Sequence, residues 1–164
     1  MIAVCGPHEA DENECRQAET VGRLLAEAGE TLVCGGRGGV MAAASRGARR
    51  AGGTTIGILP GYDRAAANQW IDHPIPTGLG EARNAVVVAS GDAVIAIGGG
   101  FGTLSEIALA LKLVKPVVTL GGWALDPARV ARLGQGGAAL LPATDPAEAV
   151  RLALGAARQP GHSQ

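Results

Sequence analysis

Two glycine-rich stretches carry the residues best suited to chemistry. They read CGGRGGVM, from Cys34 to Met41, and IGGGFGTL, from Ile97 to Leu104. Each passes from an apolar, strand-like run into a run with helical spacing. Glycine lets the backbone approach a ligand closely, and the free N–H groups at a helix start attract an anion. The two stretches therefore predict a site for a phosphate group.

Two familiar nucleotide motifs do not account for these loops. Neither has the G-x-G-x-x-G spacing with a later ribose-binding acid, and the chain contains no G-x-x-x-x-G-K-[ST]. This disfavours NAD binding and hydrolysis of nucleoside triphosphates by a P-loop. In the alternative interpretation, the glycines only make tight strand-to-helix turns. Two such loops at the ends of strands in one sheet favour the ligand-binding interpretation.

Thr103 and Glu106 have two interpretations, which the sequence leaves open. A T-x-x-E pattern at a helix start is typical of a capping box, in which each side chain satisfies the other residue's backbone N–H. If a phosphate instead takes the N–H groups of the loop, Thr103 can donate its hydroxyl to the ligand. Glu106 can then reach a sugar hydroxyl or a reacting carbon.

The remaining candidate groups suggest less chemistry. Acidic residues around His8 are expected before and within a first helical turn, so no metal site is predicted there. The three cysteines have no metal-ligand spacing and are expected to be reduced thiols. The aromatic residues Tyr62, Phe101 and Trp123 fall in loops after strands, where they can stack on a purine or pterin or simply anchor the loops.

Short β-rich runs alternate with helical stretches along the chain, as in a parallel sheet covered by helices on both faces. Strands are expected at Ile2–Cys5, Thr31–Cys34, Thr54–Leu59, Ile71–Ile75, Ala93–Ile97, Val117–Leu120 and Ala138–Leu141. Helices are expected at 13–28, 39–51, 80–90, 103–114, 126–133 and 145–157.

This pattern predicts one doubly wound, Rossmann-like α/β domain with a mostly parallel sheet of about seven strands. The domain is expected to span 1–158, with a frayed tail over 159–164. Ligands of such sheets bind beyond the carboxyl ends of the strands, where the strand order reverses. The loops that follow strands should therefore form the site.

Composition restricts the choice of partners. The chain of 164 residues has a formal net charge of −1 and is 47% hydrophobic, which disfavours disorder and a broad grip on nucleic acid. It shows no signal-peptide pattern and no apolar stretch of the roughly 20 residues that a membrane helix needs, so we expect a cytoplasmic protein with no membrane partner. The helix at 103–114 is apolar almost all round, which predicts a homodimer or homotetramer with the site near the interface.

Three stretches resemble the LOG-like Rossmann superfamily, whose members are often mislabelled lysine decarboxylases. They are CGGRGGVMAAASRGA (34–48), IPTGLGEARNAVVVASGDAVIAIGGGFGTLSEIALALK (75–112) and KPVVTL (115–120). The similarity covers most of the chain up to about Leu120. Within the superfamily, the sequence looks most like the short branch that includes molybdenum cofactor carrier proteins and DprA-related proteins.

The resemblance implies roles for individual residues. Arg83 and Glu106 would be the catalytic pair of an enzyme, and a small phosphorylated ligand would be held by a larger set. That set comprises Gly6, Gly35, Gly36, Gly39, Met41, Asn84, Gly99, Gly100, Phe101, Gly102 and Thr103. Two functions follow from it. One is binding of a phosphate-bearing nucleotide or pterin, such as the molybdenum cofactor. The other is hydrolysis of nucleoside 5′-monophosphates to free base and ribose 5-phosphate, with no cofactor required.

Departures from the hydrolase pattern favour binding over hydrolysis. Gly98 stands where the hydrolases have proline, Ser105 where they have glutamate, and Asn84 where they usually have lysine. Lysine decarboxylation is set aside because a PLP enzyme needs a lysine at its cofactor. The only lysines, Lys112 and Lys115, lie at the far end of the helix, about 14 Å or more from its start at 1.5 Å per residue.

Overall fold

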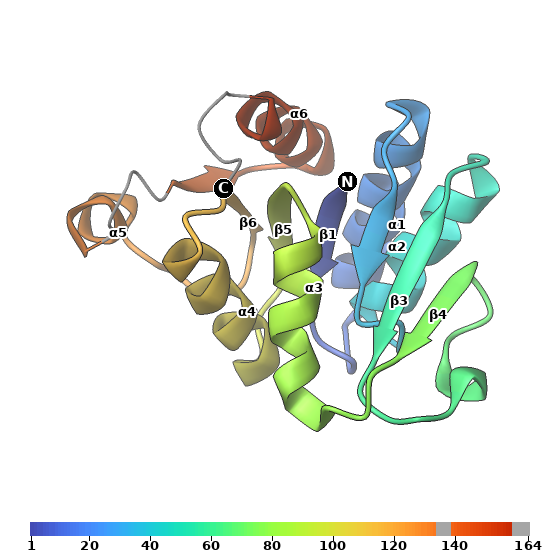
Figure 1. The fold of residues 1–164 in the computed structure, drawn as a ribbon. Helices are drawn as coiled ribbons and strands as arrows, with labels where there is room; N and C mark the ends of the chain where they lie inside the picture. The colour runs from blue at the N-terminus through green and yellow to red at the C-terminus, as the bar shows by residue number, and fades with distance from the viewer. Residues whose placement is uncertain (134–138, 159–164) are drawn as a thin grey trace.

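Seven short strands lie side by side in one sheet, and each is parallel to its neighbours (Figure 1). The computed structural model describes residues 1–133 and 139–158. The strands are β1 (Ile2–Cys5), β2 (Leu32–Cys34), β3 (Thr55–Leu59), β4 (His73–Pro76), β5 (Ala93–Ile97), β6 (Val117–Leu120) and β7 (Leu140–Ala143). Their spatial order is β4-β3-β2-β1-β5-β6-β7. The predicted α/β fold is confirmed, and its sheet is entirely parallel.

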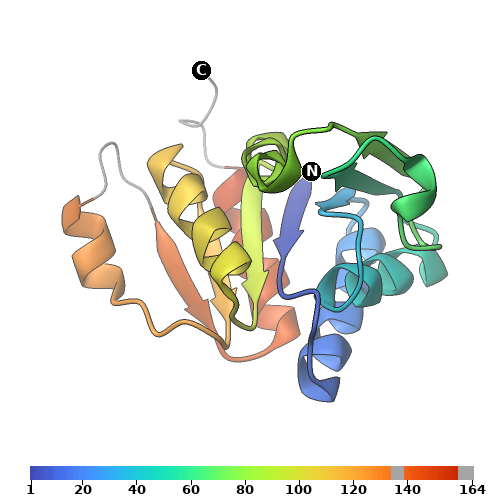
Figure 2. The same ribbon diagram turned by 90° about the horizontal axis from the view of Figure 1, so that it is seen from below.

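Six α-helices of the described residues cover the two faces of the sheet (Figure 2). On one face lie α1 (Glu12–Glu27), α2 (Val40–Arg50) and α6 (Pro146–Ala157), which pack into one apolar cluster. The other face carries α3 (Asn84–Ser90), α4 (Phe101–Lys112) and α5 (Pro127–Leu133), whose inward residues form a second cluster. The two clusters place the sheet in the middle layer of a three-layer domain.

The local sequence explains why these elements form. Strands covered on both faces need continuous apolar runs, and all residues of β1, β5 and β6 are buried. Helix α1 begins at a capping box, because the Asp11 side chain accepts from the Glu14 backbone N–H and the Glu14 side chain accepts from Asp11. Among the described residues, no helix is long and apolar enough to cross a membrane.

Several predicted boundaries differ from the structure. The helix expected at 80–90 is divided into a 3-10 turn at Gly80–Arg83 and then α3. Helix α4 begins at Phe101, two residues before its predicted start. The last strand lies at Leu140–Ala143, while residue 138 and the tail at 159–164 are outside the described residues.

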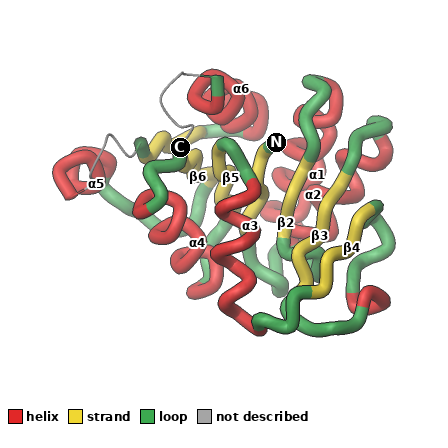
Figure 3. Tube along the Cα trace, viewed as in Figure 1, coloured by secondary structure: helices red, strands yellow, loops and turns green. Residues whose placement is uncertain are grey.

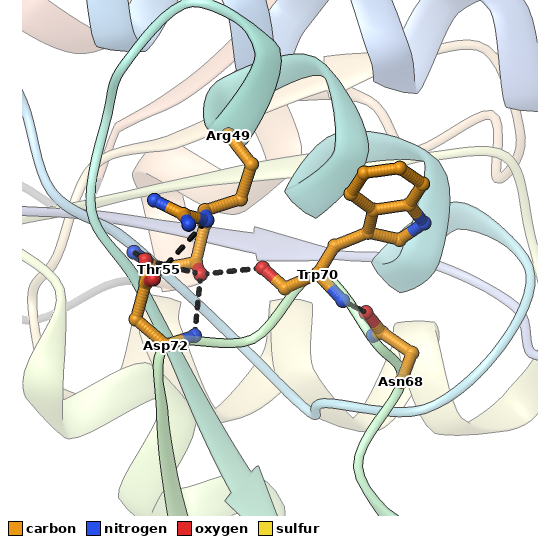
Figure 4. Close-up of polar contacts among 5 residues, drawn as sticks. All are labelled: Arg49, Thr55, Asn68, Trp70 and Asp72. Carbon is orange, nitrogen blue, oxygen red and sulfur yellow. Dashed lines mark hydrogen bonds and ion pairs between the residues drawn. The ribbon is translucent and has the colours of Figure 1, made fainter.

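A long loop leads into the edge strand β4 (Figure 3), and a polar network fastens it to β3 (Figure 4). The Thr55 hydroxyl lies 2.7 Å from the Trp70 carbonyl oxygen, and the Thr55 backbone N–H donates to the Asp72 carboxylate at 2.9 Å. Arg49 of α2 forms an ion pair with Asp72 at 3.1 Å. The Asn68 side chain continues the network by accepting from the Trp70 backbone N–H at 3.0 Å. Residues 68–72 are thereby held against both β3 and α2.

Candidate functional site

A cavity of about 370 Å³ lies at the carboxyl ends of the strands, where the strand order reverses between β1 and β5. This is where ligands of doubly wound sheets bind. Its walls come from the loop after β1, the loop after β2, the end of β3, the segment that leads into α3, and the first turns of α4. The lining residues are Gly6, Pro7, His8, Arg37, Met41, Pro60, Glu81, Arg83, Asn84, Gly100, Gly102, Thr103 and Glu106.

The start of α4 presents donors to this cavity. Gly100 is the N-cap residue, and no side chain caps the helix. The first N–H groups of a helix have no intrahelical acceptor, and here the ladder begins with the Leu104 N–H donating to the Gly100 carbonyl at 2.9 Å. The Thr103 hydroxyl, in a residue only 2% exposed, has no hydrogen-bond partner among the described residues. The capping-box interpretation of Thr103 and Glu106 is therefore wrong, because the helix starts before Thr103.

Arg83 reaches the cavity from the 3-10 turn before α3 and is 7% exposed. Its Nη1 donates to the Ile58 carbonyl oxygen at 2.7 Å, while its buried Nε has no partner in the part of the chain that the structure describes. The guanidinium packs against Gly35, where a Cβ would lie 2.0 Å from Nη1. Gly35 does not line the cavity, but only a residue without a side chain leaves room for Arg83 in this position.

Glu106 lies at the floor of the cavity and is 7% exposed. Burial raises the pKa of its carboxyl from 4.5 to about 7, although the charge of Arg83 and a hydrogen bond with the Cys5 thiol oppose this rise. Glu81 adds a smaller effect that raises the pKa further. Near neutral pH, the carboxyl is therefore divided between a form that can donate a hydrogen bond and a form that can only accept.

The thiols near this floor are structural. Cys5 ends β1 beneath Glu106, and burial raises its pKa well above the usual value, with Glu106 contributing in the same direction. Cys34 ends β2 but belongs to the apolar cluster on the opposite face of the sheet. Both are free thiols, as the sequence predicts. Since the two side chains lie on different faces, they are not placed to form a disulfide with each other.

The structure brings together eight of the residues selected from the sequence as one cavity wall: Gly6, Met41, Arg83, Asn84, Gly100, Gly102, Thr103 and Glu106. The other selected glycines lie beside the wall without lining it; they are Gly35, Gly36, Gly39 and Gly99. Five lining residues were not selected, namely Pro7, His8, Arg37, Pro60 and Glu81. All of them except Glu81 lie in loops that follow β1, β2 or β3, so their place after a strand was the available signal.

The loop-borne aromatic side chains do not line the cavity. Phe101 is 84% exposed, and its ring lies 5.9 Å from the ring of Trp123, centroid to centroid. The Trp123 Nε1–H donates to the Gly100 carbonyl oxygen at 3.1 Å. This geometry favours the interpretation in which the aromatic residues anchor the glycine loop.

Neither lysine lines the cavity. The Lys115 ammonium group, just beyond the end of α4, donates to the carbonyl oxygens of Ala89 and Gly91 at the end of α3. Lys112 lies in the last turn of α4. A cofactor bound in this cavity would therefore have no lysine in the lining with which to form a Schiff base.

The model of LDcluster4, the SLOG cluster4 family, matches residues 1–150. The chain belongs to the SLOG cluster4 family. This confirms the LOG-like resemblance of the two glycine loops.

Solved structures of similar proteins extend this family assignment. The molybdenum cofactor binding protein from the phototrophic bacterium Rippkaea orientalis is 42% identical, with a TM-score of 0.86 and 94% of each chain covered. The molybdenum cofactor carrier protein from Chlamydomonas reinhardtii is 38% identical, with a TM-score of 0.84, over 96% of this chain and 98% of the other.

A more distant structure shares the fold alone. DNA processing protein A from Streptococcus pneumoniae is 23% identical, with a TM-score of 0.67, over 92% of this chain and 60% of that one. The SLOG protein is thus similar in structure both to molybdenum cofactor carriers and to DprA, and its sequence is closer to the carriers.

Proposed function

We propose that this SLOG protein binds the molybdenum cofactor, or a phosphorylated small molecule of similar size, in the cavity at the carboxyl ends of its strands, and acts as a carrier. The observation that carries the proposal is a pair of buried groups, the Thr103 hydroxyl at the start of α4 and the Arg83 Nε beside it, for which residues 1–133 and 139–158 provide no partner. Buried polar groups without partners cost free energy. An anionic group of a ligand would recover that cost.

The composition of the walls fits such a ligand. Arg37 and Arg83 supply positive charge, and the glycine loop leaves the amides of the first turn of α4 open to an anion. Pro7, Met41 and Pro60 supply apolar surface for a flat ring. A volume of about 370 Å³ falls at the small end of the usual range for ligand sites, roughly 300 to 1,000 Å³, which suits a mononucleotide or a phosphorylated pterin.

The hydrolase remains a second candidate, because Arg83 and Glu106 line the same cavity. An ionised Glu106 would stabilise an oxocarbenium-like ribose and orient water. However, two of the residues that depart from the hydrolase pattern, Asn84 and Ser105, are hydrogen-bonded to each other. Asn84 Nδ2 donates to the Ser105 hydroxyl at 3.2 Å, and that hydroxyl donates to the Gly102 carbonyl at 2.7 Å. These bonds join α3 to α4 through a hydroxyl at Ser105, the position where the hydrolases have a glutamate. This arrangement favours the carrier.

The test is direct incubation of the purified protein with the molybdenum cofactor and, separately, with AMP. We expect both to bind and no adenine to be released. Thr103→Val should weaken binding of each by about tenfold, because it removes one hydrogen bond to a charged group. Thr119→Val is the matched control, since Thr119 is a buried threonine of β6 outside the cavity. Failure of the wild type to bind either ligand refutes the proposal. Adenine release that is lost in Glu106→Gln would establish the hydrolase instead.

We also propose that α4 meets a second copy of the chain in a homodimer or homotetramer. Its outer surface exposes the large apolar side chains Phe101 and, just past its end, Leu113, and Leu79 is exposed before α3. A negative charge at the exposed Ala108 of α4 should dissociate such an assembly. Light scattering is expected to show a multiple of the 16.4 kDa chain for the wild type and a smaller particle for Ala108→Glu. A monomeric wild type at high concentration would refute this proposal.

A further inference from the structure

The peptide unit between Arg37 and Gly38 is held at both ends by side chains from two other loops. Its N–H, on Gly38, donates to His8 Nδ1 at 3.0 Å, and its carbonyl, on Arg37, accepts from Asn68 Nδ2 at 2.9 Å. His8 belongs to the loop after β1, and Asn68 to the loop before β4. Because a peptide unit is planar, bonds at both ends fix the orientation of the whole plane.

Asn68 is itself fixed in place by its neighbours. Its backbone N–H donates to the Gly36 carbonyl at 2.9 Å, so it braces the same glycine loop at a second point. Its side-chain oxygen accepts from the Trp70 backbone N–H at 3.0 Å, and the Trp70 carbonyl lies 2.7 Å from the Thr55 hydroxyl (Figure 4). The brace on Arg37 is therefore anchored to strand β3.

The glycines around Arg37 indicate why holding this loop in place would matter for ligand binding. Arg37 lies among four glycines, in the stretch GGRGG, and its side chain lines the cavity while remaining exposed. A glycine-rich loop has unusual backbone freedom, and fixing a residue's backbone costs about 1 to 2 kcal/mol of conformational entropy. Bonds that already hold the loop remove part of that cost from ligand binding.

We propose that His8 and Asn68 are positioning residues, which together orient the Arg37–Gly38 peptide so that the Arg37 guanidinium meets the anionic group of the bound ligand. The proposal rests on the proposed function, and it adds Arg37 to the residues that contact the phosphate. Asn68 lies outside the cavity lining and His8 lies within it, but in this proposal both act on binding through that peptide. Their loss should therefore matter for binding only while the Arg37 side chain is present.

The experiment is a double-mutant cycle with AMP as the probe, measured by calorimetry. Arg37→Ala should weaken AMP binding about tenfold, as for loss of one charge-assisted contact. His8→Ala and Asn68→Ala should each weaken it about three- to fivefold, and neither should weaken it further in the Arg37→Ala background. Arg49→Ala is the control, because it breaks the ion pair with Asp72 at the far end of the same network. Its AMP affinity should stay within twofold of the wild type.

Two outcomes separate this proposal from the proposed function. Equal losses with and without the Arg37 side chain would show that His8 and Asn68 are merely structural, and would overturn the positioning role. A wild type that binds neither AMP nor inorganic phosphate would instead refute the proposed function.

Hydrogen exchange of the Gly38 amide tests the brace without any ligand. We expect exchange to be at least tenfold faster in His8→Ala, and unchanged exchange would overturn the brace itself.

Discussion

Replacing Glu106 with glutamine should make the protein more stable at alkaline pH. The folded-state pKa of Glu106 is raised from 4.5 to about 7 by burial. Between these two pH values the folded state binds more protons than the unfolded state, so the free energy of unfolding falls as the pH rises. Above pH 7 the folded protein holds a buried carboxylate, whereas the glutamine variant holds a neutral group of nearly the same shape.

The magnitude follows from the shift. At about 1.4 kcal/mol per pKa unit, the shift is worth about 3 kcal/mol once the carboxyl is fully ionised, and about 2.5 kcal/mol of this is lost between pH 5 and pH 8. Other groups with shifted pKa values, such as the Glu19 carboxyl and the amino group of Met1, are present in both proteins. Their contributions cancel when the two proteins are compared.

Urea unfolding at pH 5 and pH 8 measures this difference. The free energy of unfolding of the wild type should fall by about 2.5 kcal/mol more than that of Glu106→Gln between the two pH values. Glu81→Gln is the matched control, since Glu81 lines the same cavity but is exposed. Its pH profile should stay close to that of the wild type, because Glu81 makes the smallest contribution to the shifted pKa of Glu106. Parallel profiles for the wild type and Glu106→Gln would refute the assignment of a buried, high-pKa carboxyl to this position.

Three further predictions follow from the same contacts. Gly35→Ala should weaken AMP binding about tenfold, because the new methyl group displaces the Arg83 guanidinium. Gly61→Ala should have no effect, because no described residue lies within 4 Å of the added methyl group, and equal affinities of the two variants would contradict the packing argument. AMP binding at pH 8 should be accompanied by proton uptake onto Glu106, because a nearby anion favours the neutral carboxyl. Calorimetry in two buffers of different ionisation enthalpy should show this uptake, and Glu106→Gln should lack it. Asp72→Asn should lower the free energy of unfolding by about 1 to 3 kcal/mol, because it breaks the ion pair with Arg49 of α2 and weakens the hydrogen bonds to β3. An unchanged urea midpoint would argue against the network.

Much of the sheet was predictable because burial on both faces demands unbroken apolar runs. The bounds predicted for β1, β5 and β6 match the structure. The start of α4 was not predictable in the same way. T-x-x-E matches a capping box locally, but the chain turns earlier, at Gly98 with a φ of +66°, and the helix begins after Gly100. A local pattern contains no information on where the turn after the preceding strand ends and the helix begins.

The site was predictable where residues lie in the loops that follow strands, as Gly6 does after β1 and Gly100 after β5. Arg83 is different, because it comes from a turn far along the chain from Gly35, and no spacing reveals that the two residues touch. Only the family resemblance pointed to it. The raised pKa of Glu106 was also hidden, because it depends on burial by segments remote in sequence. Asn68 gave no signal at all, since its role depends on the path of an irregular loop.

The reversal of strand order between β1 and β5 has a mechanical consequence. Strands β2, β3 and β4 lie on one side of this junction and β6 and β7 on the other, so within the sheet the two halves are joined only by the bonds between β1 and β5. The cavity sits across the junction, with Arg37 from one half and Thr103 from the other. A ligand there would link the two halves of the sheet. Occupancy should slow the separation of the halves and so protect amides as far away as β4 and β7, which it never touches.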